Sequence, residues 1–264
     1  MQLEIVGSGE AYDRFRVNAS VLVEDQEYCL LIDCGPTVPQ ALWRRQLPSD
    51  AVDAIYLTHI HPDHASGITA LLNQWASAGR CKDLEIICQP DQQSHLRWMA
   101  DYAAWPERLP FSIGWHDATQ LTELGPWLMR TAQTRHSITN LAVRLDQKPR
   151  ASGMRGALFY SGDGRPTMES AQLMTGSVLA MQECFAHQDQ GESSHHGDLP
   201  ECLRYQRLAE PHQLLLYHIQ DGLHGVISEA VQHRTGVAVA QDGERWCCIS
   251  GKRLDLKEES YAAG

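Results

Sequence analysis

The sequence predicts an α/β (α+β) protein in which two mixed β-sheets stack face to face between outer layers of helices, a four-layer αββα sandwich. Short apolar runs of strand length alternate with longer segments whose apolar residues recur at helical spacing, the pattern of mixed sheets covered by helices. Several short runs follow one another closely enough to form hairpins. The hydrophobic content of 43% over 264 residues is sufficient for a large core. Because no repeat, low-complexity block or proline-rich linker divides the chain, we expect residues 1–264 to form one domain.

In the first half of the chain, short apolar runs predict strands and two longer segments predict helices. The segment 64–78 is expected to be helical because its apolar residues recur every three or four positions, as Leu71 and Trp75 do. A second helix is expected over 91–103. The predicted strands are 2–6, 19–24, 28–33, 53–57 and 84–89.

In the second half, helices and strands alternate after a run of strands between 111 and 161. The dipeptide Asp242-Gly243 lies between the last two predicted strands and favours a tight hairpin turn. The polar tail ends in Ala-Ala-Gly, so residues 252–264 are expected to fray. The remaining predictions are helices at 168–175, 199–209 and 222–234, and strands at 177–183, 213–218, 236–240 and 244–249.

The charge balance limits the classes of partner. The chain has 22 basic and 33 acidic residues and a formal net charge of −11, which argues against a large nucleic acid as its partner. No apolar run approaches the length of about 18 residues that spans a bilayer. Residues 1–6 have a strand pattern rather than the pattern of a signal peptide. We therefore expect a cytoplasmic protein without membrane association.

The eight cysteines include no Cys-x-x-Cys pair, and most of them lie within apolar runs. Buried free thiols are the expected state, with a cysteine zinc site as the weaker alternative. The cysteines are Cys29, Cys34, Cys81, Cys88, Cys184, Cys202, Cys247 and Cys248.

A cluster of metal-binding residue types lies between a predicted strand and a predicted helix. Residues 58–64 read Thr-His-Ile-His-Pro-Asp-His and directly follow an apolar run. In an extended segment alternate side chains share a face, so His59 and His61 are able to bind one ion together. After the turn, Asp63 and His64 are able to reach a second ion. These donors suit zinc, iron or manganese, and the lack of thiolates disfavours a closed structural zinc site.

The alternative for this cluster is a histidine-rich surface turn, but the coincidence of strand, ligands and helix start favours a metal site. Two ions would need further ligands from elsewhere in the chain. Three candidates lie beside apolar strand-like runs: His136, Asp163 and His218. Glycines flank Asp163 and allow the backbone to turn sharply there. Each residue alone is more often a turn or capping residue, but together with the cluster they favour a functional site.

The order His59-x-His61-x-Asp63-His64, then His136, Asp163 and His218, resembles the metallo-β-lactamase superfamily over nearly the whole chain. Within it, the chain is most similar to the phosphodiesterase branch that contains tRNase Z and the cyclic phosphodiesterases of phosphonate metabolism. The resemblance implies the αββα fold and a centre with two divalent metal ions. It further implies that one ion is bound by His59, His61 and His136, the second by Asp63, His64 and His218, and both by Asp163.

Further motifs carry this resemblance. Residues 136–138, His-Ser-Ile, with 140–142, Asn-Leu-Ala, resemble the third motif of the branch, although the usual Gly-Tyr is missing. The other motifs are Gly7-Ser8-Gly9, Arg16-x-Asn18-x-Ser20, Leu31-Ile32-Asp33-Cys34-Gly35, and His64 followed by Ser66-Gly67-Ile68.

A histidine in a later loop bears on the choice of branch. In tRNase Z-like proteins a His-Ser-Thr motif lies 22 residues before the last metal histidine, and His196 lies 22 residues before His218. The flanking residues differ, and His195 is the alternative if the loop is shifted by one residue. Glu183 matches the acidic residue that ends the preceding strand in that family. The competing interpretation is a polar surface loop with two solvated histidines.

The spacing between two motifs bears on the substrate. In tRNase Z a long glycine- and proline-rich arm separates the third-motif histidine from the bridging aspartate, whereas only 27 residues separate His136 from Asp163. A missing tRNA-clamping arm and an acidic chain together indicate a small substrate. We therefore expect a dinuclear phosphodiesterase that acts on a small or cyclic phosphodiester, with a metal-bridging hydroxide as nucleophile. Zinc is the expected metal, with manganese and iron as alternatives.

Two residues are expected to take part directly in catalysis. Asp63 would orient the hydroxide while it binds metal, and His196 would protonate the leaving oxygen. Arg14, Arg16 and His195 are candidates for substrate contact, although exposed loop arginines are more often solvated.

Two other enzyme classes share most of these ligands. A thioester or lactone hydrolase, like glyoxalase II or the acyl-homoserine lactonases, would use the same ligands and would not need His196. A mononuclear iron enzyme resembling persulfide dioxygenase would not use Asp63 as a ligand.

Three tryptophans, Trp98, Trp105 and Trp115, lie between a predicted helix and a predicted strand. Large aromatic side chains bury much apolar area when they pack. Such a cluster favours a packed core or a homodimer interface over a substrate lid.

Overall fold

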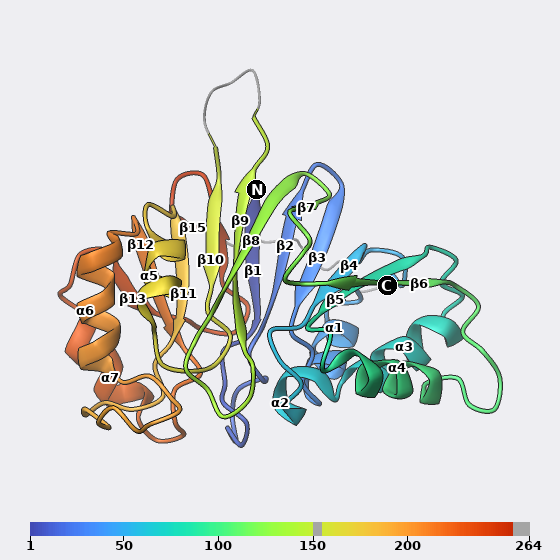
Figure 1. The fold of residues 1–264 in the computed structure, drawn as a ribbon, viewed down its shortest axis with the longest axis horizontal. Coiled ribbons are helices and arrows are strands. Elements are labelled where there is room, and N and C mark those ends of the chain that lie inside the picture. Colours follow the sequence, from blue (N-terminus) through green and yellow to red (C-terminus); the bar gives the residue numbers. More distant parts are fainter. Residues whose placement is uncertain (150–154, 256–264) are drawn as a thin grey trace, which may run out of the picture.

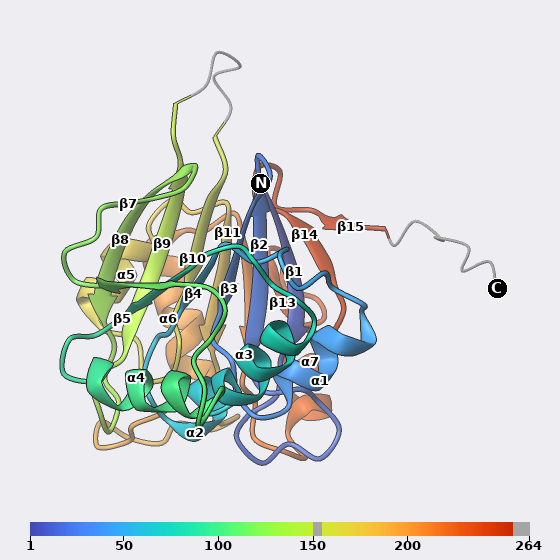
Figure 2. The same ribbon diagram turned by 90° about the vertical axis from the view of Figure 1, so that its right-hand side faces the viewer.

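Two mixed β-sheets lie face to face in the computed structural model, which describes residues 1–149 and 155–255 (Figures 1 and 2). The strands of the first sheet are β1 (Gln2–Gly7), β2 (Ser20–Asp25), β3 (Tyr28–Ile32), β4 (Ala54–Tyr56), β5 (Leu84–Cys88), β6 (Ile113–Asp117), β14 (Arg245–Cys247) and β15 (Arg253–Leu254). Within the described residues their order is β15-β14-β1-β2-β3-β4-β5-β6. The pairs from β3 to β6 are parallel, and the pairs on the other side of β3 are antiparallel.

The second sheet is built in the same mixed way. Its strands are β7 (Glu123–Leu124), β8 (Trp127–Gln133), β9 (Leu141–Gln147), β10 (Ala157–Tyr160), β11 (Leu179–Glu183), β12 (Gln213–Tyr217) and β13 (Val237–Val239). They are ordered β13-β12-β11-β10-β9-β8-β7 in the described part of the chain. The pairs from β10 to β13 are parallel, and those from β7 to β10 are antiparallel.

Helices cover the outer face of each sheet, so the predicted αββα sandwich is confirmed (Figure 1). The helices on the first sheet are α1 (Val38–Arg44), α2 (Pro62–Ala65), α3 (Ile68–Ser77) and α4 (Gln93–Tyr102). Those on the second sheet are α5 (Met168–Met174), α6 (Leu199–Ala209) and α7 (His224–Val231). None of the helices among the described residues is long and apolar enough to cross a bilayer.

The alternation of side chains along each strand divides the core into layers. In β3, Leu30 and Ile32 pack between the two sheets, whereas Leu31 packs toward the helices. In β12, Leu215 lies between the sheets and Leu214 lies on the helical side. Since both faces of these strands are buried, their sequences are continuously apolar rather than alternating.

The parallel strands of both sheets end at the same edge of the sandwich, the lower edge in Figure 1. Polar residues follow these strands within three positions: Asp33 after β3, Thr58 after β4, Asp163 after β10 and His218 after β12. Loops at the carboxyl ends of parallel strands converge, and this is where α/β folds place their ligands. The fold therefore brings together polar groups that are far apart in the sequence.

The predicted helix at 64–78 is interrupted at Ser66 and Gly67, which separate α2 from α3. The Gly67 N–H donates to the carbonyl of Cys34 at 2.8 Å. A Cβ at position 67 would clash with the carbonyl oxygen of Gly35, so glycine is required for this close approach. The interruption attaches the histidine-rich segment to the end of β3.

The predicted hairpin around Asp242-Gly243 is wrong, because β13 pairs with β12 in one sheet and β14 pairs with β1 in the other. The Asp242 carboxylate accepts hydrogen bonds from Ser8 N (2.8 Å), Ser8 Oγ (2.7 Å) and Val17 N (2.8 Å). The Gly243 N–H donates to the carbonyl of Ile5 at 2.7 Å. The turn residues therefore carry the chain from one sheet to the other instead of closing a hairpin.

Two elements were not predicted. Helix α1 has seven residues, which is too short for a clear helical period. Strand β15 lies within the tail expected to fray, and it pairs with β14 while Arg253 Nη1 lies 2.7 Å from Glu244 Oε1. The prediction of fraying is therefore wrong for Arg253 and Leu254, and residues 256–264 lie outside the described part of the chain.

The cysteines are free and mostly buried, as predicted. Cys81 is exposed and Cys247 is partly exposed, whereas the other six are buried. Burial raises the pKa of several thiols, for example of Cys88 to about 11, so these cysteines stay protonated at neutral pH. None of the groups of metal-binding side chains in the described residues includes a cysteine.

We expect Asp242→Ala to lower the free energy of unfolding by roughly 2–4 kcal/mol, because it removes three hydrogen bonds that attach the connection between the two sheets to the segment between β1 and β2. Urea unfolding followed by circular dichroism measures the change. The matched control is Asp255→Ala, since Asp255 is exposed and is the last residue that the structure describes. Equal stabilities of the two variants would contradict an anchoring role for Asp242.

Candidate metal centre

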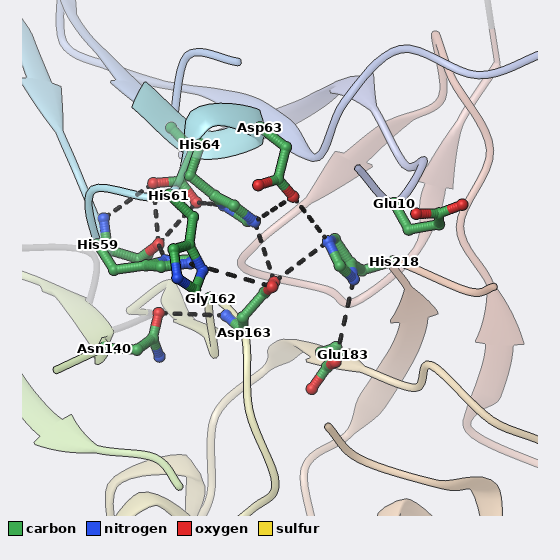
Figure 3. A network of polar contacts seen from close by, with 12 residues as sticks. Glu10, His59, His61, Asp63, His64, Asn140, Gly162, Asp163, Glu183 and His218 are labelled. Carbon is green, nitrogen blue, oxygen red and sulfur yellow. Dashed lines mark hydrogen bonds and ion pairs between the residues drawn. The ribbon is translucent and has the colours of Figure 1, made fainter. Parts of the chain in front are cut away.

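The residues of the predicted metal site meet at the edge where the parallel strands end (Figure 3). The histidine-rich segment follows β4 and enters α2, and His136 lies between β8 and β9. Asp163 follows β10, and His218 follows β12. Both sheets therefore contribute side chains, and these side chains form two adjoining groups.

Three imidazoles form the first group. His59 Nε2 lies 3.0 Å from His61 Nδ1, and His136 Nε2 lies 2.9 Å from the same His61 atom. Burial lowers the pKa of each of the three rings, so their converging nitrogens keep free lone pairs at neutral pH. Three neutral imidazoles that converge in this way are suited to coordinate one divalent ion.

The outer nitrogens of two of these rings are held by hydrogen bonds. His59 Nδ1 lies 3.1 Å from Thr58 Oγ1, and His136 Nδ1 donates to the carbonyl of His195 at 3.0 Å. An occupied outer N–H fixes the tautomer of the ring and directs the other nitrogen toward an ion.

Two histidines and two carboxylates form the second group. His64 Nε2 lies 3.3 Å from Asp63 Oδ2 and 3.0 Å from Asp163 Oδ1, and His218 Nε2 lies 3.3 Å from both oxygens. Burial alone would lower the pKa of these two imidazoles. The carboxylates outweigh it and raise the pKa of His64, and that of His218 to about 9. A negative potential that holds protons on buried imidazoles equally favours a divalent cation.

Two inward atoms of the second group lack hydrogen-bond partners in the described structure. His64 Nε2 and Asp163 Oδ1 are both buried and unpaired, although they are only 3.0 Å apart. They are therefore not aligned as donor and acceptor. Because unpaired buried polar atoms are costly, a cation that contacts both atoms would remove the penalty. The donor set fits one divalent ion in each group.

Asp163 lies between the two groups. Its Oδ1 faces the second group, while its Oδ2 lies 4.0 Å from both His59 Nε2 and His136 Nε2. The Asp163 N–H donates to Asn140 Oδ1 at 3.2 Å, which holds the turn after β10. Gly162 has φ +61°, and a Cβ there would clash with Asn140 and Thr58, so only glycine allows this carboxylate to project between the groups.

Asp33 positions residues of both groups through hydrogen bonds. Its fully buried carboxylate accepts hydrogen bonds from Thr58 N (2.8 Å) and Thr58 Oγ1 (2.9 Å), and it lies 2.8 Å from His64 Nδ1. The bond to His64 occupies the outer nitrogen and leaves Nε2 for the second group. Thr58 in turn contacts His59, so one carboxylate positions a histidine of each group.

His218 has a left-handed backbone conformation with φ +54°. Non-glycine residues rarely adopt this conformation, and it persists where the surrounding contacts enforce it. Here the His218 N–H donates to the carbonyl of Ser8 at 2.9 Å. The ring enters the second group because the loop after β1 holds the backbone.

His196 lies at the edge of the centre, held by Glu183. His196 Nδ1 is 2.5 Å from Glu183 Oε1, and the Gly197 N–H donates to Glu183 Oε2 at 3.0 Å. The His196 ring centroid lies 5.0 Å from that of His136. Burial would lower the pKa of His196, but the hydrogen bond and charge of Glu183 raise it above its ordinary value. The ring is partly exposed, unlike the buried Glu183.

The three residues proposed for substrate contact are His195, Arg14 and Arg16, and none of the contacts below is between two of them. His195 is exposed, and its carbonyl rather than its ring contacts His136. Arg14 Nε lies 2.6 Å from Asp221 Oδ2 at the surface. Arg16 Nη1 lies 3.4 Å from Asp13 Oδ2. Both arginines are thus paired with carboxylates of the protein, and a substrate would have to compete with these pairs.

Asp33 and Asn140 lie within sequence motifs, but the motifs do not predict that these two residues position the donor groups. The sequence does contain a signal for the importance of Asp33, because this charged residue directly follows the apolar run of a predicted strand. A buried charge demands partners, but the sequence does not say which ones. Asn140 bonds both Asp163 N and the carbonyl of Ser161, contacts that exist only after β9 and β10 pair.

A family model described as "Anti-Pycsar protein Apyc1" matches residues 1–241. A curated protein of that name from Bacillus phage 010DV004 is 44% identical over 89 residues, which is 33% of this chain and 35% of the relative. The aligned part thus spans about a third of the relative's length.

Two solved structures have the same fold. One is the metallo-β-lactamase fold protein YhfI from Bacillus subtilis, with a TM-score of 0.77 and 22% identity over 93% of this chain and 98% of that chain. The other is the short form of human tRNase Z, with a TM-score of 0.77 and 18% identity over 94% of this chain and 99% of that chain. At these identities the similarity establishes the metallo-β-lactamase fold alone.

We expect about two divalent ions per chain after reconstitution, one for each group of donors. Asp63→Ala should lower the ratio to about one, because only the second group loses a ligand. Elemental analysis of desalted protein measures the ratio. Asp221→Ala, which alters a surface carboxylate, is the control. A wild-type ratio of one that Asp63→Ala leaves unchanged would favour the mononuclear iron alternative.

We expect Asp33→Asn to weaken metal binding by about 10- to 100-fold, the range for lost positioning contacts around metal ligands. Asparagine tolerates the left-handed backbone at this position, where φ is +60°. Its amide can still accept from Thr58 but cannot accept from both Thr58 and His64. Competition with a chelating dye measures the affinity, and an unchanged value would remove Asp33 from the metal centre.

Proposed function

Because the chain belongs to the anti-Pycsar protein Apyc1 family, we propose that it is a metal-dependent phosphodiesterase that hydrolyses a small cyclic phosphodiester, with a cyclic nucleotide as the substrate class. The position of His196 beside the donor groups is the observation that carries the phosphodiester assignment. Glu183 holds it against the donor groups. A hydrolase that expels a thiolate has less need of a proton donor at this place.

The residues of the two groups would hold the ions and the reacting phosphate. His59, His61 and His136 would bind one ion, Asp63, His64 and His218 the other, and Asp163 both. Zinc is the metal that we propose, since imidazole and carboxylate donors suit it, with manganese and iron as alternatives. When bound, the ions lower the pKa of a coordinated water and neutralise charge on the phosphoryl group.

Two side chains would take part in the reaction directly, His196 as the proton donor and Asp63 as the residue that orients the attacking water. The Nδ1 atom of His196 faces Glu183, so Nε2 is the atom that can carry a proton to a departing alkoxide. Glu183 stabilises the imidazolium form, and a proton from solvent would restore it after each turnover. Asp63 would orient the attacking water, because its Oδ2 lies at the inner side of the second group.

The segment of the chain between the third motif and Asp163 bears on the size of the substrate. Most of the described residues between His136 and Asp163 belong to β9 and β10, two adjacent strands of the second sheet. The described part of this segment contains no arm that would hold a large RNA. The acidic chain also repels polyanions, so we infer a small diester.

We expect His196→Ala to lower kcat for an alkyl diester by about 10²–10⁴-fold, the scale of general acid catalysis, with unchanged metal content. An alkoxide needs a proton on departure and a nitrophenolate does not. Bis-p-nitrophenyl phosphate should therefore be hydrolysed by the variant far better than the alkyl diester.

The matched control is His195→Ala, which alters the neighbouring exposed ring while the backbone contact to His136 remains. Thioesters and lactones are assayed in parallel. Equal losses on both diesters would remove the acid role from His196. Efficient hydrolysis of a thioester or lactone, with no activity on either diester, would replace the phosphodiesterase proposal by the alternative hydrolase class.

A further inference from the structure

A pocket adjoins the metal centre on the side of α4. Its volume is about 460 Å³, and its apolar wall consists of Ile60, Trp98, Met99 and Ile138. Trp98 is 67% exposed. The interpretation of this tryptophan as part of a packed core is therefore wrong, and the same holds for Trp105, which is 76% exposed.

The pocket and the first donor group share a wall. Ile60 lies between His59 and His61, and Ile138 lies two residues after His136. The two segments meet where His61 Nε2 lies 3.4 Å from Ser137 Oγ. His61 is also partly exposed, unlike the buried His59. A molecule whose phosphate contacts the metal centre could therefore reach the pocket by passing over the edge of His61.

The lining of the pocket favours a neutral, planar ring. An exposed indole and three aliphatic or thioether side chains offer stacking and apolar contact. No lysine or arginine is among the lining residues of the described structure. His95 is the one basic side chain in this lining, and the carboxylate of Asp91 would repel an anion. A second phosphate or a carboxylate is therefore a poor occupant, whereas a nucleobase fits.

Two contacts hold the walls in place before any ligand binds. Gln92 Nε2 donates to the carbonyl of Thr139 at 2.8 Å, and Thr69 Oγ1 donates to the carbonyl of Met99 at 3.0 Å. The buried Gln92 Oε1 has no partner among the described residues, which leaves an unused acceptor in the pocket wall. Trp98 itself stacks on Tyr102, with ring centroids 5.6 Å apart and planes at 5°.

We propose that this pocket binds the nucleobase of the cyclic nucleotide, with Trp98 as the stacking residue. The inference rests on the proposed function, which supplies a substrate with both a phosphate and a base. Recognition by stacking is tolerant of base identity, because every base has a π-face. The enzyme should therefore accept several nucleobases.

The test compares two substrates that differ only in the base. One is a nucleoside 3′,5′-cyclic monophosphate, and the other is the same cyclic phosphate with a methoxy group in place of the base. Trp98→Ala should raise KM for the nucleotide by about 5- to 150-fold, the range for loss of one stacked base, and should leave KM for the base-free substrate unchanged. Trp98→Phe should retain most of the wild-type KM, because it keeps an aromatic face.

Trp43→Ala is the matched control, since Trp43 is 41% exposed on α1, outside the pocket. Circular dichroism verifies that each variant is folded. An equal KM of wild type for the two substrates, or an equal effect of Trp98→Ala on both, would overturn the nucleobase subsite. Loss of a wild-type dimer in Trp98→Ala, with both KM values unchanged, would assign the aromatic surface to a second copy of the chain instead.

A binding measurement separates failure of this inference from failure of the proposed function. Calorimetry with a hydrolysis-resistant nucleoside cyclic phosphorothioate gives the affinity without turnover. If wild type hydrolyses neither substrate, the phosphodiesterase proposal fails. In that case, weaker phosphorothioate binding by Trp98→Ala than by Trp43→Ala would still support the subsite, and equal binding would overturn it.

Discussion

The buried carboxylate of Asp33 is the constraint on which the candidate metal centre depends. A charge with no exposure to solvent needs hydrogen-bond partners. The partners of Asp33 here include Thr58, which follows β4, and His64, which lies in α2. These bonds connect the end of β3 to the histidine-rich segment and set the orientation of His64. Because Thr58 also contacts His59, one buried group positions a ligand in each donor group.

The two donor groups differ in their electrostatics although they share Asp163. Burial keeps the three imidazoles of the first group neutral, whereas the carboxylates of the second group favour positive charge on His64 and His218. Without an ion, the carboxylates of the second group favour the protonated forms of His64 and His218, whose Nε2 atoms are the ones that would bind a cation. Metal binding at this group is therefore coupled to the release of protons, and the first group has little such coupling.

The surroundings of the centre divide the recognition of a substrate into two parts. Phosphate would be bound where positive charge is concentrated, between the ions and His196. The pocket beside Ile60 and Trp98 has no lysine or arginine among its described lining residues and offers stacking instead. Since Ile60, which lines the pocket, directly precedes His61 of the first donor group, a compact substrate is able to contact both. An acidic chain without a clamping arm in its described residues has no comparable surface for a long polyanion.

The sequence by itself determined the layered fold, most of its elements and the candidate donor residues that the structure brings together, because strand and helix periods and the spacing His59-x-His61-x-Asp63-His64 are local properties. It could not determine which strands pair. The Asp242-Gly243 turn has the local chemistry of a hairpin, yet its carboxylate bonds to Ser8 and Val17, which are more than 200 positions away. For the same reason the sequence did not predict the contacts of Asp33 and Asn140 with the donor groups or the exposure of Trp98. Only the tertiary structure decides which distant backbone groups satisfy a buried polar side chain and which apolar side chains remain uncovered, because both depend on contacts between segments that the sequence separates.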